Sequence, residues 1–471
     1  MKKALTLMLI AASILLCSCT RGYETNLLLD SKENKTAIFT LKEQAKQITQ
    51  DMLNKIDPAT RGYVRKIATV DVITYGQLFG TQTRNESDST ENGDKYINPA
   101  LVIVNFEDST GYGLLVPKFD EDDIYNPEDD EENWTNPLGL LAITDSGAIT
   151  TEEIISNGTN SNDDSGTTSE VLITPNELYD ETLDDYIIGN TDPEELITNI
   201  ALTYIYNIAN NPLYNITIPE DNVDLEEVES VAENQKGPLL KTTWHQNAPF
   251  NAQVHTYNSA GDRRPLGCTT IAAAQIIAYL KDIKPSEYFG VNSTWAQIES
   301  EDFTQYGNDY SNLSTTALNT TIILKQMADG IGVRYNYSGK GETFAYPKNV
   351  QHYLENELDY NIDRKIGGRK AKRLKEIVNS INNNKPVWFA GLGGGKHGHA
   401  WVVDGYKKND NATKSKHDYF IHCNFGWGGK NNGWYLIDLF RSTMNDDDEL
   451  DAKVPENYLR IGWSYRYLFF E

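Results

Sequence analysis

Apolar and polar positions alternate in two different ways along the first half of the chain. Across 36–56, apolar side chains recur every three or four residues, which is typical of an amphipathic helix. Thr40, followed three residues later by Glu43, predicts a capping box near the start of this helix. Strand-like runs rich in β-branched residues come next, at 64–76, in a hairpin at 98–120 and at 137–149.

Two polar stretches interrupt this half of the chain. Residues 119–134 and 155–170 contain few apolar side chains, so we expect long exposed loops. The first stretch holds many carboxylates that could bind Ca²⁺, but it lacks the ligand order and the glycine of an EF-hand. A second helix is predicted over 193–211. The acidic segment 219–238 then indicates a linker between domains.

The second half has helical periodicity first and strand patterns afterwards. Helices are predicted at 268–281, 315–331, 348–358 and 370–383. Strands are predicted at 385–393, 399–407, 418–425, 433–440 and 463–470. A block of helices followed by a block of strands predicts an α+β fold with an antiparallel sheet.

The chain begins with an export signal. Residues 1–19 have two lysines, an apolar stretch of about 14 residues and the ending Leu16-Cys17-Ser18-Cys19. This ending resembles a bacterial lipobox, which implies that Cys19 is lipidated and becomes the first residue of the mature protein. An ordinary cleaved signal without lipid is the alternative. Residues 20–35 are polar and are expected to form a tether.

Charge separates the two halves and excludes some functions. Residues 20–236 contain 43 acidic and 13 basic side chains, whereas residues 237–471 contain 25 and 27. The net charge of −26 repels nucleic-acid phosphates, so we expect no nucleic-acid binding. No internal apolar run reaches the roughly 18 residues that span a bilayer, so we expect membrane contact only through the lipid.

The stretch RPLGCTTIAAAQIIAYL, residues 264–280, contains the first candidate for chemistry. Cys268 begins the predicted helix, where free N–H groups and the helix dipole favour a thiolate. Gly267 before it leaves room for a substrate backbone. A buried, inert cysteine is the alternative. Cys423 is the only other thiol in the folded body, so a disulfide is a weak prediction.

A thiolate needs a proton-transfer partner, and GLGGGKHGHAWVVDGY (391–406) supplies histidines. His399 opens a predicted strand after a glycine-rich stretch that includes Gly398, and imidazole transfers protons near neutral pH. His397 is its rival on the same strand. Either histidine could instead be structural.

Two further residues complete a candidate site. Asn424, in HCNFGWGGKNNGW (422–434), ends a strand and can hold an imidazole in one tautomer without adding charge. A plain hairpin turn is the alternative for this loop. The backbone N–H of Cys268 and the side chain of Gln246 are candidate oxyanion donors. A cysteine first, with histidine and asparagine later, is the order of papain-like enzymes.

These segments resemble the streptopain family of bacterial cysteine proteases. The resemblance rests on HQNAPFN (245–251), GCTTIAAAQIIAYL (267–280), KPVWFAGLGGGKHGHAWVVDGY (385–406) and HCNFGWGGKNNGWYLIDL (422–439). It implies a papain-like fold, Cys268 as nucleophile, His399 rather than His397 as general base, Gln246 in the oxyanion hole and Asn424 as the loop asparagine. The family usually has tryptophan where this chain has Phe425, which puts the positioning of His399 in doubt. Gly267, Gly398, Phe425 and Trp427 are the expected substrate-binding residues.

The resemblance also covers the first half, which is similar to the family's inhibitory propeptide. We therefore expect a propeptide-like domain at 36–218, cleavage in the linker 219–238 and a peptidase domain at 239–471. The implied function is a lipid-anchored, exported cysteine endopeptidase made as a zymogen, acting on proteins or peptides without a cofactor or metal. The alternatives are a cell-wall peptide amidase or transglutaminase-like enzyme, and a non-catalytic surface binding protein on a protease scaffold.

Overall fold

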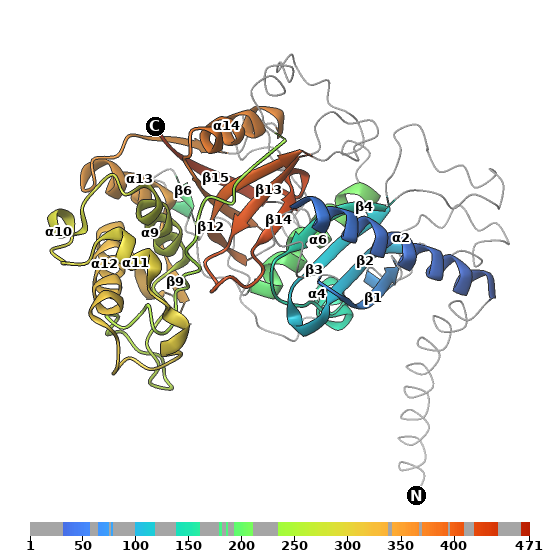
Figure 1. Cartoon of the computed structure of the whole chain (residues 1–471), viewed down its shortest axis with the longest axis horizontal. Coiled ribbons are helices and arrows are strands. Elements are labelled where there is room, and N and C mark those ends of the chain that lie inside the picture. Colours follow the sequence, from blue (N-terminus) through green and yellow to red (C-terminus); the bar gives the residue numbers. More distant parts are fainter. Residues whose placement is uncertain are drawn as a thin grey trace, which may run out of the picture. The chain divides into compact units, whose positions relative to one another are not determined.

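The computed structural model (Figure 1) describes residues 32–56, 65–74, 77–78, 99–117, 138–160, 179–180, 185–186, 193–210, 234–337, 342–366, 370–393, 396–408, 419–440 and 463–471. Within these ranges the chain forms two compact units. The first includes residues up to 108, together with 113–140 and 150–162, and the second includes 109–112, 141–149 and 163–471. The signal segment and the acidic stretch 119–134 lie outside the described residues.

In the first unit a helix packs on an antiparallel sheet. Helix α2 (Lys32–Ile56) contacts β1 (Ile67–Thr74) and β2 (Pro99–Phe106), which pair with Val70 opposite Val104. Strands β3 (Tyr112–Pro117) and β4 (Leu138–Thr144) follow in the sheet order. All but one of the β2 side chains and all of the β3 side chains are buried, as expected for apolar runs rich in branched residues. The predicted helix and strands of this region are confirmed.

Two local predictions in this unit are wrong. Helix α2 begins eight residues before Thr40, whose hydroxyl donates to the Thr36 carbonyl at 3.0 Å, a mid-helix bond rather than a cap. Residues 155–160 belong to helix α4 (Thr151–Asn160), not to an exposed loop. Thr150 and Glu153 form a reciprocal capping box at the start of α4, with bonds of 2.7 and 3.2 Å, which explains why this polar stretch is helical.

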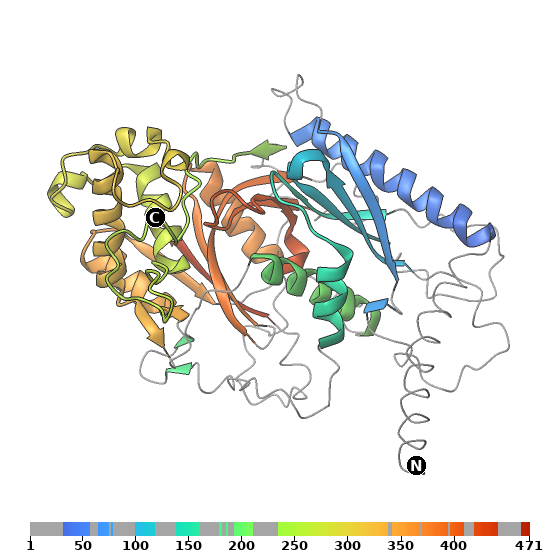
Figure 2. The same ribbon diagram turned by 90° about the horizontal axis from the view of Figure 1, so that it is seen from below.

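The second unit contains most of the helices. They are α6 (Pro193–Asn210), α9 (Cys268–Leu280), α10 (Pro285–Tyr288), α11 (Trp295–Ser300), α12 (Thr315–Ile331), α13 (Pro347–Asn356) and α14 (Lys370–Asn382), with 3-10 turns η4 (Phe303–Tyr306) and η5 (Ile437–Phe440). Figure 2 shows the olive and yellow helices, which include α9, α11 and α12, grouped on one side of the orange and red strands.

An antiparallel sheet forms the rest of the second unit, and with the helices it confirms the predicted α+β class. Its order is β14 (Gly433–Leu436), β13 (Tyr419–Asn424), β12 (Lys396–Lys408), β11 (Val387–Gly393), β15 (Trp463–Phe470) and β10 (Ile362–Ile366). The end of β4 pairs with β14, and β7 (Gln235–Lys236) pairs with β12. Two small hairpins lie apart: β5 (Tyr179–Asp180) with β6 (Asp185–Tyr186), and β8 (Arg334–Tyr337) with β9 (Glu342–Phe344).

Helix α9 is the buried centre of this unit. Every residue from Cys268 to Ala278 is buried, and the helix packs on Trp388 and Ala390 of β11 and on Ala400 and Val402 of β12. The Trp388 indole N–H donates to the Thr269 carbonyl at 3.2 Å, which ties the first turn of α9 to the sheet. The first turn of the helix is therefore held directly against β11.

Candidate active site

Gly267 lets the chain enter helix α9 at a sharp angle. Its φ of +97° lies in the region that glycine adopts without a steric penalty. A Cβ at this position would also lie 3.3 Å from the Thr343 Cγ2. Gly267 is the N-cap residue, so Cys268 occupies the first helical position, as predicted.

The Cys268 thiol is buried, with 3% of the residue exposed. Burial raises its pKa to about 12, although the backbone N–H groups of Ala400, Thr269 and Cys268 itself act to lower it. In this structure the sulfur is a neutral thiol surrounded by donors that would stabilise its thiolate. The Ala400 contact places the sulfur beside the residue that follows His399.

The His399 imidazole is fully buried and held by a main-chain group. Its Nε2 lies 2.8 Å from the Phe425 carbonyl oxygen. A carbonyl only accepts, so Nε2 carries the proton and Nδ1 keeps the lone pair. Burial lowers the pKa of His399 to about 4, while the Phe425 carbonyl acts in the opposite direction. Within the described residues Nδ1 has no hydrogen-bond partner, so the thiol and the imidazole are not hydrogen-bonded.

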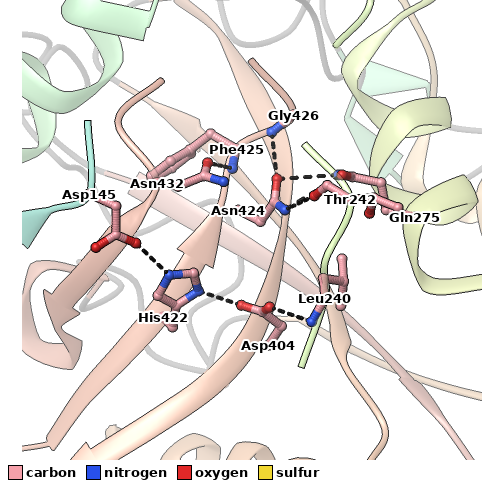
Figure 3. Close-up of polar contacts among 10 residues, drawn as sticks. All are labelled: Asp145, Leu240, Thr242, Gln275, Asp404, His422, Asn424, Phe425, Gly426 and Asn432. Atoms are coloured by element: carbon pink, nitrogen blue, oxygen red, sulfur yellow. Dashed lines mark hydrogen bonds and ion pairs between the residues drawn. The ribbon is translucent and has the colours of Figure 1, made fainter. Parts of the chain in front are cut away.

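Asn424 lies next to this contact but does not bond the imidazole. Its Nδ2 donates to the Thr242 carbonyl at 2.8 Å, and its Oδ1 accepts from the Gly426 N–H at 3.2 Å (Figure 3). The direct orientation of His399 that we expected from Asn424 is thus made by the Phe425 carbonyl in this structure. Asn424 instead holds the turn that carries this carbonyl.

Aromatic rings enclose His399. Trp427 stacks on the imidazole with ring centroids 4.3 Å apart, and Phe425 stacks on Trp427 at 5.0 Å. Phe425 is completely buried, with Trp401 and Tyr435 each at 5.4 Å. Its side chain therefore forms the wall behind the histidine and presents no surface to a substrate here, whereas Trp427 is half-buried.

The remaining predicted residues lie around the same point. Gln246 is buried, and its main-chain carbonyl accepts the Leu266 N–H at 2.8 Å, which holds the 245–251 loop beside the entry to α9. Gly398 is buried with a φ of +71° just before His399. The side chain of His397 lies outside the described residues. Cys268 and Cys423 are both free, so no disulfide joins them.

A second histidine site had no counterpart in the sequence predictions. His422 Nδ1 lies 2.6 Å from the Asp404 carboxylate, and its Nε2 lies 3.2 Å from Asp145 (Figure 3). Burial alone would lower the pKa of His422, but Asp404 and Asp145 raise it to about 10. His422 is therefore a buried cation paired with two carboxylates. Within the described residues, no group of three or more histidine, cysteine or acidic side chains could hold a metal ion.

Comparison with known proteins identifies the class of this site. Residues 244–435, about two fifths of the chain, match the model of the Peptidase C10 family. The match spans Gln246, Cys268, His399 and Asn424, and the resemblance to streptopain-type cysteine proteases is confirmed.

Individual relatives are distant. The chain is 26% identical over 239 residues to the thiol protease/hemagglutinin PrtT of Porphyromonas gingivalis, covering 44% of this chain and 24% of that protein. It is 28% identical over 203 residues to streptopain of Streptococcus pyogenes, covering 38% and 47%. The matches thus span less than half the length of these relatives. A solved prointerpain A fragment of Prevotella intermedia aligns with a TM-score of 0.41 and 17% identity over 78% of this chain and 94% of that one.

Proposed function

We propose that this chain is an exported cysteine endopeptidase that is synthesised as an inactive precursor. The proposal rests on one observation, namely the main-chain groups that surround the Cys268 sulfur and the His399 imidazole. Three backbone N–H groups converge on the Cys268 sulfur, and a carbonyl fixes the proton of His399 on Nε2. This leaves Nδ1 as the atom that accepts a proton, which is the arrangement a thiol nucleophile needs.

The reaction follows from these groups. His399 Nδ1 takes the thiol proton, and the Cys268 sulfur attacks a peptide carbonyl. The Cys268 N–H and the Gln246 side chain stabilise the oxyanion. The imidazolium then protonates the leaving amine, and water hydrolyses the acyl-enzyme through the same histidine. Trp427, stacked on the imidazole, excludes water from one face of the ring.

The neutral state of both groups supports the precursor part of the proposal. Burial raises the pKa of the thiol to about 12 and lowers the pKa of the imidazole to about 4, which is opposite to a thiolate–imidazolium pair. We propose that activation brings the thiol and Nδ1 within hydrogen-bond distance and admits solvent or substrate. We propose that residues 36–218 act as the inhibitory domain and that cleavage within 219–238 releases it.

Export and anchoring rest on the first residues of the chain. The basic start, the apolar stretch and the Leu16-Cys17-Ser18-Cys19 ending support a lipoprotein signal with Cys19 as the lipidated residue. Among the described helices, none is long and apolar enough to cross a bilayer. Metabolic labelling with a palmitate analogue should mark the wild type and Cys17→Ser but not Cys19→Ser. Equal labelling of the wild type and Cys19→Ser would contradict lipidation at this residue.

The two buried cysteines provide the main test. The full-length chain is purified, its processing and casein cleavage are followed with and without a thiol-specific covalent inhibitor, and Cys268→Ala is compared with Cys423→Ala. We expect inhibitor-sensitive cleavage that Cys268→Ala abolishes and Cys423→Ala retains, because Cys268 lies beside Ala400, next to His399, whereas Cys423 in β13 has Trp401 and Asp404 as its neighbours. Hydrolysis of cell-wall peptides but not of casein, or failure of processed protein to alkylate at Cys268, would refute the endopeptidase.

Self-processing is tested with the same variants. Mass spectrometry of the wild-type products should locate the first cut within 219–238. Cys268→Ala should remain uncut alone and should be cut when wild-type enzyme is added. Processing of Cys268→Ala alone at the wild-type rate would show that another protease activates the chain.

A further inference from the structure

Gln275 is a buried polar side chain in an otherwise apolar part of helix α9. It is 0% exposed, between Ala274 and Ile276. It follows Cys268 by seven residues, which is close to two helical turns, so the two side chains lie on the same face about 10 Å apart along the axis. Burying a carboxamide costs free energy of folding unless its donors and its acceptor are hydrogen-bonded.

The Gln275 carboxamide joins two segments that carry predicted catalytic groups. Its Oε1 accepts the Trp244 N–H at 3.2 Å, two residues before Gln246. Its Nε2 donates to the Asn424 Oδ1 at 3.3 Å, and its Oε1 lies 3.5 Å from the Asn424 Nδ2 (Figure 3). One side chain on the nucleophile helix thus contacts both the loop of Gln246 and the turn beside His399.

The path continues from Asn424 to the imidazole through one peptide group. The Asn424 Oδ1 accepts the Gly426 N–H at 3.2 Å. This N–H belongs to the same peptide unit as the Phe425 carbonyl, whose oxygen lies 2.8 Å from His399 Nε2. A hydrogen bond to the N–H of a peptide fixes the plane of the group and polarises its C=O. Asn424 therefore acts on His399 through the Phe425–Gly426 peptide.

Resting on the function proposed above, we propose that Gln275 is a positioning residue for the Cys268–His399 site. It holds the Asn424 carboxamide, which holds the peptide that fixes the ring and the tautomer of His399, and it sets the register between α9 and the Gln246 loop. A merely structural carboxamide would affect the stability of the core. A positioning residue also affects the state of the imidazole and the chemical step.

The test compares three variants of the full-length chain. Gln275→Met keeps a long side chain but removes the Oε1 acceptor and the Nε2 donor. Gln275→Asn keeps a carboxamide, but its side chain is one methylene too short to reach the same partners. Thr270→Val is the matched control, because Thr270 is equally buried on α9 and its hydroxyl has no hydrogen-bond partner among the described residues. Thermal unfolding of each variant identifies any that fail to fold.

The first readout does not require activity. With ¹⁵N-histidine labelling, only seven histidines are observed, and His399→Gln identifies the His399 signals. We expect wild type and Thr270→Val to show a proton on His399 Nε2 that exchanges slowly with solvent. Both Gln275 variants should show exchange at least about 10-fold faster or a mixture of tautomers, since the carbonyl acceptor is no longer held.

The second readout uses the processed enzyme. Both Gln275 variants should lower kcat by about 10- to 100-fold with KM nearly unchanged, and should shift the pH profile of kcat/KM. An inactive wild type would refute the proposed function, while the imidazole readout would still test Gln275. A folded Gln275 variant with wild-type imidazole exchange and a wild-type pH profile would overturn the positioning role.

Discussion

The Nε2 atom of His399 lies 2.8 Å from the main-chain oxygen of Phe425. The residue at position 425 thus contributes to the site in two separate ways. Its carbonyl fixes the imidazole, and its ring, stacked on Trp427 at 5.0 Å, forms the buried wall. Any residue at this position supplies the carbonyl, so phenylalanine in place of the family's tryptophan leaves the orienting contact intact.

Phe425→Trp should therefore change stability more than chemistry. The Phe425 ring is fully buried among Trp401, Trp427 and Tyr435, so a larger indole is expected to cost about 1–3 kcal/mol of unfolding free energy. The pH profile of kcat/KM should stay that of the wild type. Phe440→Trp, in the same aromatic cluster but without a contact to His399, is the control. A shifted pH profile in Phe425→Trp alone would show that the ring, too, tunes the histidine.

Gly426 should tolerate no side chain. Its φ is +70°, and a Cβ there would lie 2.9 Å from the Ile271 Cγ2 on helix α9. Gly426→Ala is expected to displace the Phe425–Gly426 peptide and lower kcat by at least about 10-fold. Gly429→Ala is the matched control, because it has a φ of +88° but its Cβ would meet Thr243 at an ordinary 3.5 Å. Similar kcat values for the two variants would mean that the Ile271 contact has no role.

Periodicity was enough to predict the buried helix that begins at Cys268. The glycine before Cys268 and the apolar run after it indicate a buried helix starting at the cysteine, and the structure has this arrangement. The α+β class followed in the same way from the order of helices and strands. The family resemblance, rather than spacing, favoured His399 over His397.

Three features escaped prediction because they depend on tertiary contacts. The Phe425 carbonyl is a main-chain group and has no sequence signature. Gln275 looks like a single polar interruption of an apolar helix, and only its contacts with Trp244 and Asn424 give it a role. Asp404 is the extra residue of a β-bulge, since Val403 pairs with Cys423 and Gly405 with His422. A bulge breaks the two-residue alternation that predicts inward positions.

The two carboxylates of His422 should contribute unequally to stability. The Asp404 side chain is 1% exposed and also accepts the Leu240 N–H at 2.9 Å, whereas the Asp145 side chain is 41% exposed. Asp404→Asn is expected to cost about 3–5 kcal/mol because it leaves a buried imidazolium without its main partner. Asp145→Asn should cost less than about 1 kcal/mol, because solvent screens this pair. Denaturant unfolding compares the two, and equal losses would contradict the assignment by burial.

His422 also predicts how stability varies with pH above neutrality. Its pKa is raised to about 10 in the folded chain, against about 6.5 when unfolded. The charged imidazole thus stabilises the fold fully below pH 6.5, and this stabilisation is lost as the pH rises toward 10. The slope approaches about 1.4 kcal/mol per pH unit at most. Below pH 6.5 stability instead falls as the pH falls, because burial lowers the pKa of His399 to about 4 and also lowers that of His245.

The window from pH 7.5 to 8.5 isolates this effect, because the imidazoles of His399 and His245 are there almost entirely neutral in the unfolded chain as well. Burial also raises the pKa of Cys423 and Cys268, which adds a loss of stability mainly above this window. We expect denaturant midpoints of the wild type to fall steadily across this window. His422→Gln should be less stable at pH 7.5 and should show a much flatter profile up to pH 8.5. His352→Gln, at an exposed histidine on α13, should keep the wild-type slope. A wild-type profile that is already flat over this range would show that His422 is neutral in the folded chain.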